Sequence, residues 1–434
     1  MHKVSLYLLV MTQTALGLFN ILLILHIFGN GATTDAYFLT GAVVSAMSLV
    51  QLLLVEQFLV FYNDIDAGQR QERAHFVGAV TALSLVSGGG IGVLLFLFAE
   101  PSIQLFAWSI AAVTLTEAGV LLKEMLLMVL LFPLSHVLRS CLNAEGYFVH
   151  TFVAQLFPGL TVFGLLLLMV FGIVLVDIHH VAMAFSAGAL LQAAVLVLIS
   201  RRKGLLLGVY VWHEKIAAML RNSTSIRVSH NVHNVMSSIV INNLLASYPQ
   251  GALSTYHYAK RAVEAVSGAV FGAPQTVLAA KTSEFWSQGR YLDIAPLRRK
   301  FLAISGPLFV AVIMVAYIAL PYMLEIVAPN LTGDVVTAIA FMLLLFAGWT
   351  LVIAFEAPYV AVLVAAKDAK AFMIVNSIFI AVFSLVAYAG TRQFGPEIIP
   401  VSAAMAQILS WYLYRRIATE SLGRNAGVMT GRSK

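Results

Sequence analysis

The sequence predicts an all-α polytopic membrane protein with about twelve transmembrane helices in two six-helix bundles. The chain of 434 residues is 60% hydrophobic and only 11% charged, and its mean hydropathy is +0.90. Soluble domains carry about 25% charged residues, and about 20 consecutive apolar residues are enough for a helix to cross a bilayer. Composition and the repeated occurrence of such stretches together determine this fold class.

The apolar segments lie near residues 4–28, 36–62, 75–99, 119–142, 149–175, 180–200, 226–247, 252–280, 301–324, 336–364, 371–390 and 398–414. The first segment follows Lys3 and is not followed by a small-residue cleavage site. We therefore interpret it as a transmembrane helix and not as a cleaved signal peptide.

The basic residues predict the orientation of these helices. Of the 26 Lys and Arg residues, only Arg392 falls in a loop on the side opposite the N-terminus, and Lys123, Lys260 and Arg261 fall inside helices. All the others gather on the side of the N-terminus. Cytoplasmic loops of membrane proteins carry such an excess, so we predict that both termini are cytoplasmic. The net charge of +6 then reflects topology, and no nucleic-acid partner is expected.

The longest polar interruption predicts the domain organisation. Residues 1–200 form an N-terminal six-helix lobe, 226–414 a C-terminal six-helix lobe and 415–434 a cytoplasmic basic tail. Residues 201–225 form a linker, either an amphipathic helix on the cytoplasmic leaflet or an extension of the next helix. An offset of 220 residues places Gly31-Ala32 on Gly251-Ala252. Six helices separate these pairs, which indicates a parallel pseudo-repeat with a substrate site between the lobes.

The predicted span that begins at Gly251 carries Lys260, Arg261 and Glu264. Charge in the middle of a bilayer costs at least about 2.5–3.5 kcal/mol per residue, so these groups must face protein or water. Arg261 either binds a diphosphate through its two-pronged guanidinium or only pairs with Glu264 three residues later. Lys260 lies about 100° around the helix and either extends this cationic site or turns toward another helix. His257, one turn before Arg261, either lines the cavity or is structural.

Besides Glu264, three acidic residues are candidates for gating or ion coupling. Asp35 begins the second helix, where an acid stabilises the helix N-terminus; the alternative is a contact with a cation in one gating state. Glu56 and Glu356 lie deep in their segments. They either bind a coupling ion, form a cytoplasmic gate, or are solvated at the membrane interface.

The sequence offers no support for covalent or metal chemistry. The eleven histidines are scattered, and no nucleophile turn is recognisable. The glycine run Ser87-Gly88-Gly89-Gly90-Ile91-Gly92 lacks the Gly-Lys-Ser/Thr of a phosphate loop, which favours close helix packing. We therefore predict a transporter without catalytic residues, metal or cofactor.

Three stretches of the chain resemble a known family. The turn after the first helix reads IFGNGATTDAYFL, Leu142-Asn143-Ala144 and Phe148 follow the fourth, and Tyr258-Ala259-Lys260-Arg261 with Ser267-Gly268 lie in the eighth. Together they resemble the MviN/MurJ-type lipid flippases of the multidrug/oligosaccharidyl-lipid/polysaccharide exporter superfamily. The resemblance implies two six-helix bundles around a central cavity and export of a polyprenyl-diphosphate-linked sugar by alternating access.

The chain departs from this family where the family brings arginines into the cavity from helices 1 and 2. Here the matching positions of helix 1 are Thr14 and Asn20, only His26 offers a titratable group at the outer end of that helix, and helix 2 has no basic residue. We therefore predict a multi-pass flippase of the bacterial inner membrane for a lipid-linked saccharide, an exopolysaccharide or cell-envelope precursor, in preference to lipid II. Its predicted substrate-binding residues are Arg261, Lys260, His257, Asn20, Thr14 and His26, and its gating or ion candidates are Asp35, Glu56, Glu264 and Glu356.

The predicted partners are the lipid-linked saccharide, a coupling ion (H+ or Na+) or the membrane potential, and polysaccharide synthesis or polymerase proteins. One alternative is a multidrug/cation antiporter of the same superfamily, which the lack of Asp and Glu in helices 1 and 7 disfavours. The other is a non-transporting scaffold of an envelope-polysaccharide synthesis complex, which the sparse basic cavity favours.

Overall fold

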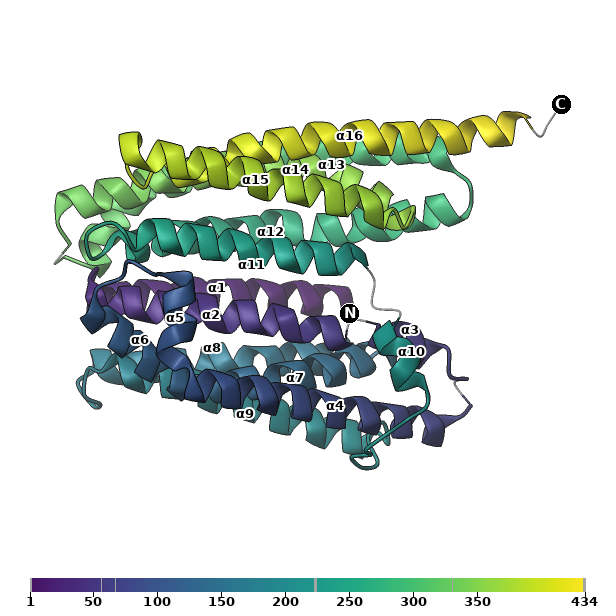
Figure 1. The fold of residues 1–434 in the computed structure, drawn as a ribbon, viewed down its shortest axis with the longest axis horizontal. Coiled ribbons are helices and arrows are strands. Elements are labelled where there is room, and N and C mark those ends of the chain that lie inside the picture. Colours follow the sequence, from purple (N-terminus) through teal and green to yellow (C-terminus); the bar gives the residue numbers. More distant parts are fainter. Residues whose placement is uncertain (1, 56, 67, 222–224, 330, 432–434) are drawn as a thin grey trace. The chain divides into compact units, whose positions relative to one another are not determined.

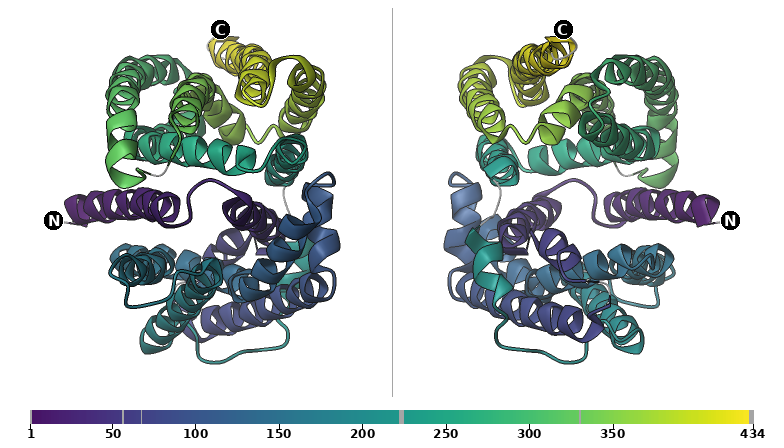
Figure 2. Two further views of the ribbon diagram at one scale, coloured as in Figure 1. Left: turned by 90° about the vertical axis from the view of Figure 1, so that its left-hand side faces the viewer. Right: turned by 90° about the vertical axis from the view of Figure 1, so that its right-hand side faces the viewer.

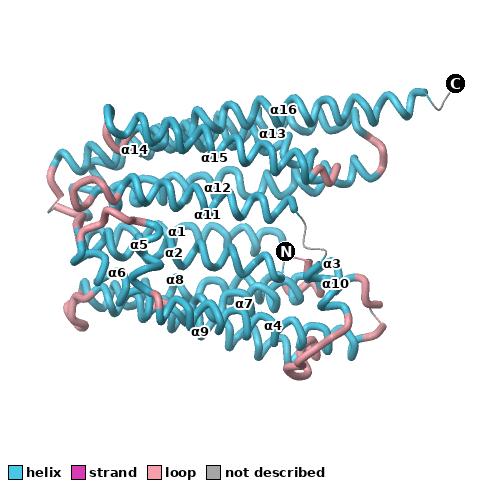
Figure 3. Tube along the Cα trace, viewed as in Figure 1, coloured by secondary structure: helices cyan, strands magenta, loops and turns pink. Residues whose placement is uncertain are grey.

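The structure, a computed structural model, describes residues 2–55, 57–66, 68–221, 225–329 and 331–431. Throughout these ranges the regular structure is helical, with no strand (Figures 1 and 3). Nine helices of the described part are long and apolar enough to cross a membrane. The predicted all-α polytopic membrane fold is thus confirmed, while the number of twelve spans and their orientation stay predictions.

The contacts divide the chain into two compact units. The first comprises residues 1–224 and 245–254, and the second comprises residues 225–244 and 255–434. After the first 224 residues the chain thus contributes residues 225–244 to the second unit and residues 245–254 to the first. From residue 255 onward it belongs to the second unit. Figure 2 looks along the helices of each unit and shows that both are helical bundles.

The long helices of the first unit are α1 (His2–Phe28), α2 (Ala32–Val55), α4 (Arg70–Leu97), α7 (Leu126–Ala144), α8 (Phe148–Val170) and α9 (Ile178–Arg202). Short helices lie between them: α3 (Phe58–Asn63), α5 (Ala99–Phe106), α6 (Ala112–Glu124) and α10 (Lys215–Arg221). The second unit contains α11 (Ser225–Leu245), most of α12 (Ala252–Ser287), η1 (Tyr291–Asp293), α13 (Ile294–Val327), α14 (Gly333–Ala365), α15 (Ala369–Phe394) and α16 (Ile398–Gly431). Each long helix overlaps one of the apolar segments of the sequence, although the segment predicted over residues 36–62 is divided between α2 and α3.

The region between α4 and α7 differs from the expected boundaries. The apolar segment predicted from residue 119 is interrupted, because α6 ends at Glu124 and the chain turns at Met125 before α7 begins. His179 at the start of α9 holds this turn: its Nδ1 lies 3.0 Å from Glu124 Oε2, and its Nε2 lies 3.4 Å from Glu117 Oε1. Glu124 therefore belongs to a short connecting helix and not to a spanning one.

An ion pair and an aromatic cluster stabilise the opposite end of the first unit. Arg73 of α4 pairs with Glu145 after α7 at 2.8 Å, and the Tyr62 hydroxyl donates to the same carboxylate oxygen at 2.8 Å. The rings of Phe58 and Tyr62 are fully buried, and the Phe58 ring stacks with those of Tyr62 and Phe76. Burying such aromatic side chains contributes about 1.5–3 kcal/mol each. Short helix α3 is thereby fixed against α4 and α7.

The linker is only partly helical. Residues 205–212 run without helix, and α10 covers residues 215–221 alone. A Cβ atom added to Gly78 of α4 would collide with the Gly208 carbonyl oxygen and the Tyr210 ring. The linker therefore packs tightly over the start of α4, which explains why its amphipathic pattern does not extend into one long helix.

The glycines of the run in α4 differ in their surroundings: some pack closely against α7 and others face open space. A Cβ atom at Gly88 would collide with the backbone carbonyl of Leu130 in α7, whereas none of the described atoms lies within 4 Å of one at Gly90. We expect Gly88→Ala to lower the thermal unfolding midpoint, because overpacking against backbone costs about 1–3 kcal/mol. Gly90→Ala is the matched control and should leave the midpoint unchanged or raise it. Equal midpoints for the two variants would contradict the packing role.

Candidate functional site

The cationic residues of α12 share one carboxylate. Lys260 Nζ lies 3.7 Å from Glu264 Oε1, and Arg261 Nη1 lies 3.1 Å from Glu264 Oε2. The Arg261 side chain is 53% exposed and that of Lys260 34%. Ion pairs at such exposure contribute about 0–1 kcal/mol. An anionic ligand can therefore replace Glu264 as the partner of Arg261 at little cost.

The depth of these cations within α12 determines what must surround them. Arg261 is nine residues after Ala252, which places it about 14 Å along a helix of 36 residues. This depth falls within a hydrocarbon core of about 30 Å. An exposed guanidinium at that level requires a water-filled space. The prediction that α12 spans the bilayer therefore implies a hydrated cation at this depth.

His257 lies one turn closer to the start of α12 and is buried. Its exposed fraction is 8%, and its ring packs edge-on against Tyr256 with the centroids 5.5 Å apart. Tyr256 in turn packs edge-on against Phe346 of α14. His257 is thus part of the packing of the second unit, while Lys260, Arg261 and Glu264 form the exposed cluster.

The three candidates on α1 are in different environments and do not form one cluster. Asn20 is buried, and its Nδ2 donates to the Gly159 carbonyl oxygen of α8 at 3.0 Å. Thr14 is partly buried, and His26 is exposed near the end of the helix. Asn20 therefore joins α1 to α8, which distinguishes it from the less buried Thr14 and His26.

Asp35 binds the start of α12. One of its carboxylate oxygens accepts a hydrogen bond from the Gly251 N–H at 2.7 Å, and the other accepts one from the Ser254 N–H at 2.7 Å. The Ser254 hydroxyl also donates to Asn30 Oδ1. Amides in the first turn of a helix have no partner within the helix, so Asp35 acts as the cap of α12 and not of its own helix α2. No local sequence pattern marks this pairing, because 216 residues separate Asp35 from Gly251.

Glu356 of α14 is a buried carboxylate with a neutral partner. Its Oε2 accepts a hydrogen bond from Gln407 Nε2 of α16 at 2.6 Å, and Gln407 Oε1 accepts one from Trp349 Nε1 at 3.3 Å. Among the described residues no cation forms an ion pair with it. The only sequence signal for Gln407 was an amide in an apolar segment. Glu56, the third acidic candidate, lies outside the described residues.

The described residues contain no group of three or more His, Cys, Asp and Glu side chains that could hold a metal ion. The candidate residues, each considered by itself, offer charge and hydrogen bonding: a cation on α12, a capping acid on α2 and a buried acid on α14.

Comparisons with known proteins place this geometry in a family. The family of the lipid II flippase MurJ matches residues 24–430. Among solved structures, the lipid II flippase MurJ in an inward closed conformation is similar with a TM-score of 0.75 at 16% identity, covering 98% of this chain and 90% of that one. An inward-facing multidrug resistance MATE family transporter of the MOP superfamily is similar with a TM-score of 0.74 at 10% identity, covering 96% of this chain and 98% of that one. No curated protein matches the chain in sequence. Because the family match spans nearly the whole chain, the protein belongs to the MurJ lipid II flippase family, whose members are transporters.

Proposed function

We propose that this protein flips a polyprenyl-(di)phosphate-linked saccharide, an exopolysaccharide or cell-envelope precursor, across the bacterial inner membrane by alternating access. The observation that carries the proposal is Arg261, a half-exposed guanidinium about 14 Å along a helix of the flippase fold. A guanidinium binds phosphate oxygens through two parallel hydrogen bonds. The predicted substrate-binding residues of α1 are the neutral Thr14 and Asn20 and the titratable His26. They favour a substrate that needs few cationic contacts.

In this mechanism the phosphates of the headgroup replace Glu264 on Arg261, and Lys260 contributes a second positive charge. The polyprenyl chain stays in the lipid. His26 and Thr14 are proposed to contact the saccharide, and His257 and Asn20 are proposed to support the site through helix packing. The contact between Asp35 and the start of α12 is the proposed outer gate. Glu56 is proposed as an element of the inner gate.

The proposal is tested with the purified full-length protein in liposomes. The probe is a fluorescent short-chain polyprenyl-diphosphate disaccharide, whose exposure on the outer leaflet is measured by chemical quenching. We expect its movement between leaflets to require the protein and the diphosphate, and a neutral glycolipid with the same chain to stay in place. No protein-dependent movement would support the scaffold alternative, and movement of a cationic drug in exchange for protons would support the antiporter alternative.

We propose Glu356 as the residue that couples transport to protons, and Glu356→Gln tests this role. A buried carboxylate with only a neutral partner gains stability when it is protonated, because charge is costly in a low-dielectric interior. The glutamine variant mimics the protonated form and should remove the response of flipping to a pH gradient, measured in the same liposomes. Glu325→Gln, which changes an exposed glutamate of α13, is the control and should respond like the unaltered protein. A full response in Glu356→Gln would exclude this role.

A further inference from the structure

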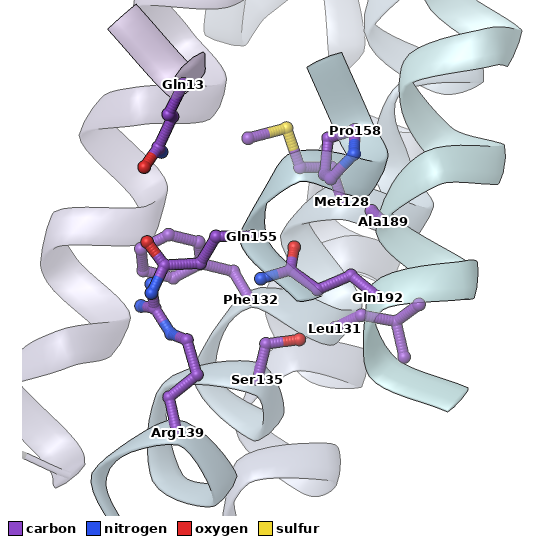
Figure 4. Close-up of a pocket in the computed structure, with 10 residues that line it drawn as sticks. All are labelled: Gln13, Met128, Leu131, Phe132, Ser135, Arg139, Gln155, Pro158, Ala189 and Gln192. Carbon is purple, nitrogen blue, oxygen red and sulfur yellow. The ribbon is translucent and has the colours of Figure 1, made fainter. Parts of the chain in front are cut away.

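The first unit contains a cavity that the α12 site does not include. Its volume is about 160 Å³, and its polar lining consists of Gln13, Ser135, Arg139, Gln155 and Gln192 (Figure 4). These residues come from four helices, α1, α7, α8 and α9. At about 30 Å³ for each water molecule, the cavity holds about five waters. It is smaller than the roughly 300 Å³ at which pockets for drug-sized ligands begin, so it suits a small group and not a whole saccharide.

Arg139 gives this cavity its charge. Its Nε atom is fully buried and has no hydrogen-bond partner among the described residues. No described acidic side chain forms an ion pair with it, and no acidic residue lines the cavity. A buried charge without a partner is costly in a protein interior. The charge of Arg139 therefore makes the binding of an anion in this cavity favourable.

The other polar side chains of the cavity are also available for hydrogen bonds to a ligand. The side chains of Gln13, Ser135, Gln155 and Gln192 form no hydrogen bond with another described residue, although each belongs to a helix that is long enough to span a membrane. Figure 4 shows Gln13 and Arg139 approaching the cavity from opposite ends, with Gln155, Gln192 and Ser135 between them. Amides and hydroxyls donate hydrogen bonds as well as accept them. Donors therefore converge from several directions on one small space.

The geometry points to a binding site for a phosphoryl group in this cavity, and we propose that Arg139 is its principal ligand. A guanidinium has five donors and no acceptor, and its planar fork matches phosphate oxygens. A tetrahedral phosphoryl group carries several acceptor oxygens, so it can use donors from four helices at once, which a planar carboxylate cannot do equally well.

The position of the cavity relates it to the proposed function. Arg139 lies five residues before the end of α7, about 7.5 Å from its predicted cytoplasmic end. A substrate made in the cytoplasm would meet this site before it reaches the outer gate. The source of the phosphoryl group, the lipid-linked saccharide, rests on the proposed function. A soluble phosphate or diphosphate would bind through the same chemistry, and the experiment separates the two.

The test measures ligand-induced stabilisation of the purified full-length protein, with farnesyl diphosphate, inorganic pyrophosphate and farnesol as probes. All measurements are made in an Arg261→Ala background, so that the α12 site does not contribute. A ligand that binds the folded state raises the thermal midpoint with its concentration. We expect farnesyl diphosphate to stabilise the protein and farnesol to have no effect. Stabilisation by inorganic pyrophosphate at equal strength would assign the site to soluble anions instead of the lipid.

Two substitutions link the binding to Arg139. Arg139→Met keeps much of the side-chain volume and removes the charge, and we expect the stabilisation to disappear. Arg139→Lys keeps the charge but loses the fork, and we expect the midpoint response to need about tenfold more ligand. Arg416→Met, which removes an exposed arginine paired with Glu420 at 3.0 Å, is the control and should respond like the background protein.

The failure of this proposal is distinct from failure of the proposed function. An unchanged response in both Arg139 variants, equal stabilisation by farnesol, or no response to either phosphorylated probe would overturn the phosphoryl site. A different result would refute only the proposed function. In that case no flipping is seen in liposomes, but farnesyl diphosphate still stabilises the protein in a way that depends on Arg139. If Arg139→Met does not fold, the Arg139→Lys variant carries the test.

Discussion

Arg261→Ala is expected to reduce the flipping of a polyprenyl-diphosphate-linked saccharide by about 10- to 150-fold. Hydrogen bonds to charged groups contribute about 1.5–3 kcal/mol, and each 1.4 kcal/mol corresponds to a factor of ten. Arg261→Lys should retain an intermediate rate, because lysine keeps the charge and loses the two-pronged geometry. The measurement is the initial rate of leaflet exchange in liposomes, together with accumulation of the surface polymer in a strain that depends on the variant.

The chain provides a closely matched control for this substitution. Arg290 is 53% exposed, as Arg261 is, and it too pairs with an acid three residues later, Asp293. Arg290→Ala removes the same charge and the same kind of ion pair outside the proposed site. We expect it to leave the flipping rate unchanged. A similar loss in both variants would attribute the effect to net charge and not to the site.

Glu264→Gln distinguishes a ligand-binding Arg261 from one that only neutralises its neighbour. If Arg261 serves the substrate, releasing it from Glu264 should leave flipping intact or lower the substrate concentration needed for half-maximal rate. If the pair with Glu264 is its whole purpose, Glu264→Gln and Arg261→Ala should be equally harmful. This second pattern, with normal protein levels in the membrane, would contradict the site assignment.

The long helices were predictable because each follows from a local property of the chain. An apolar run of sufficient length forms a spanning helix whatever its neighbours are, since backbone groups in lipid must bond within the segment. The exceptions are places where a predicted helix is interrupted or shortened by contacts with distant residues. The turn at Met125 depends on contacts between His179 and two glutamates that are far away in the sequence, and the short extent of α10 depends on Tyr210 packing over Gly78.

The partners of the candidate residues were much harder to predict. The ion pairs of Arg261 and Lys260 with Glu264 follow from helical spacing alone. The partners of Asp35 and Glu356 lie on other helices, and a single sequence contains no signal for such pairs. The cavity around Arg139 shows the same limit, although an indication was present: Gln13, Gln155 and Gln192 are isolated amides in apolar segments. Polar groups at such positions are expensive and mark functional surfaces in membrane proteins.

Asp35→Ala is expected to shift the outer gate toward its open form by about 10- to 150-fold. The carboxylate accepts two backbone hydrogen bonds at the start of α12, and alanine leaves both amides without a partner. If this contact exists in only one state of the transport cycle, its loss changes the population of the two states by the free energy of the contact, about 1.5–3 kcal/mol. Asp35→Asn keeps one acceptor oxygen and should give a smaller shift.

Cysteine accessibility measures this shift directly. Cys141 is buried, and it is the single cysteine of the chain, so Cys141→Ser provides a background for labelling. Leu253, between the two amides that Asp35 binds, is 2% exposed. In Leu253→Cys we expect an impermeant maleimide to react about tenfold or more faster when Asp35→Ala is also present, because a buried thiol reacts only after the contact opens.

Asp177→Ala separates gating from the simple loss of a helix cap. Asp177 accepts a hydrogen bond from the His179 N–H at 2.9 Å and thereby caps α9 within the first unit. Its removal costs the same charge and about 1 kcal/mol of capping energy, but it should leave labelling at Leu253→Cys and the flipping rate unchanged. Faster labelling in Asp35→Ala alone, accompanied by reduced flipping, would identify the contact as a moving part. Equal labelling in all three proteins would make Asp35 a static cap, and the outer gate would then have to be sought elsewhere on α12.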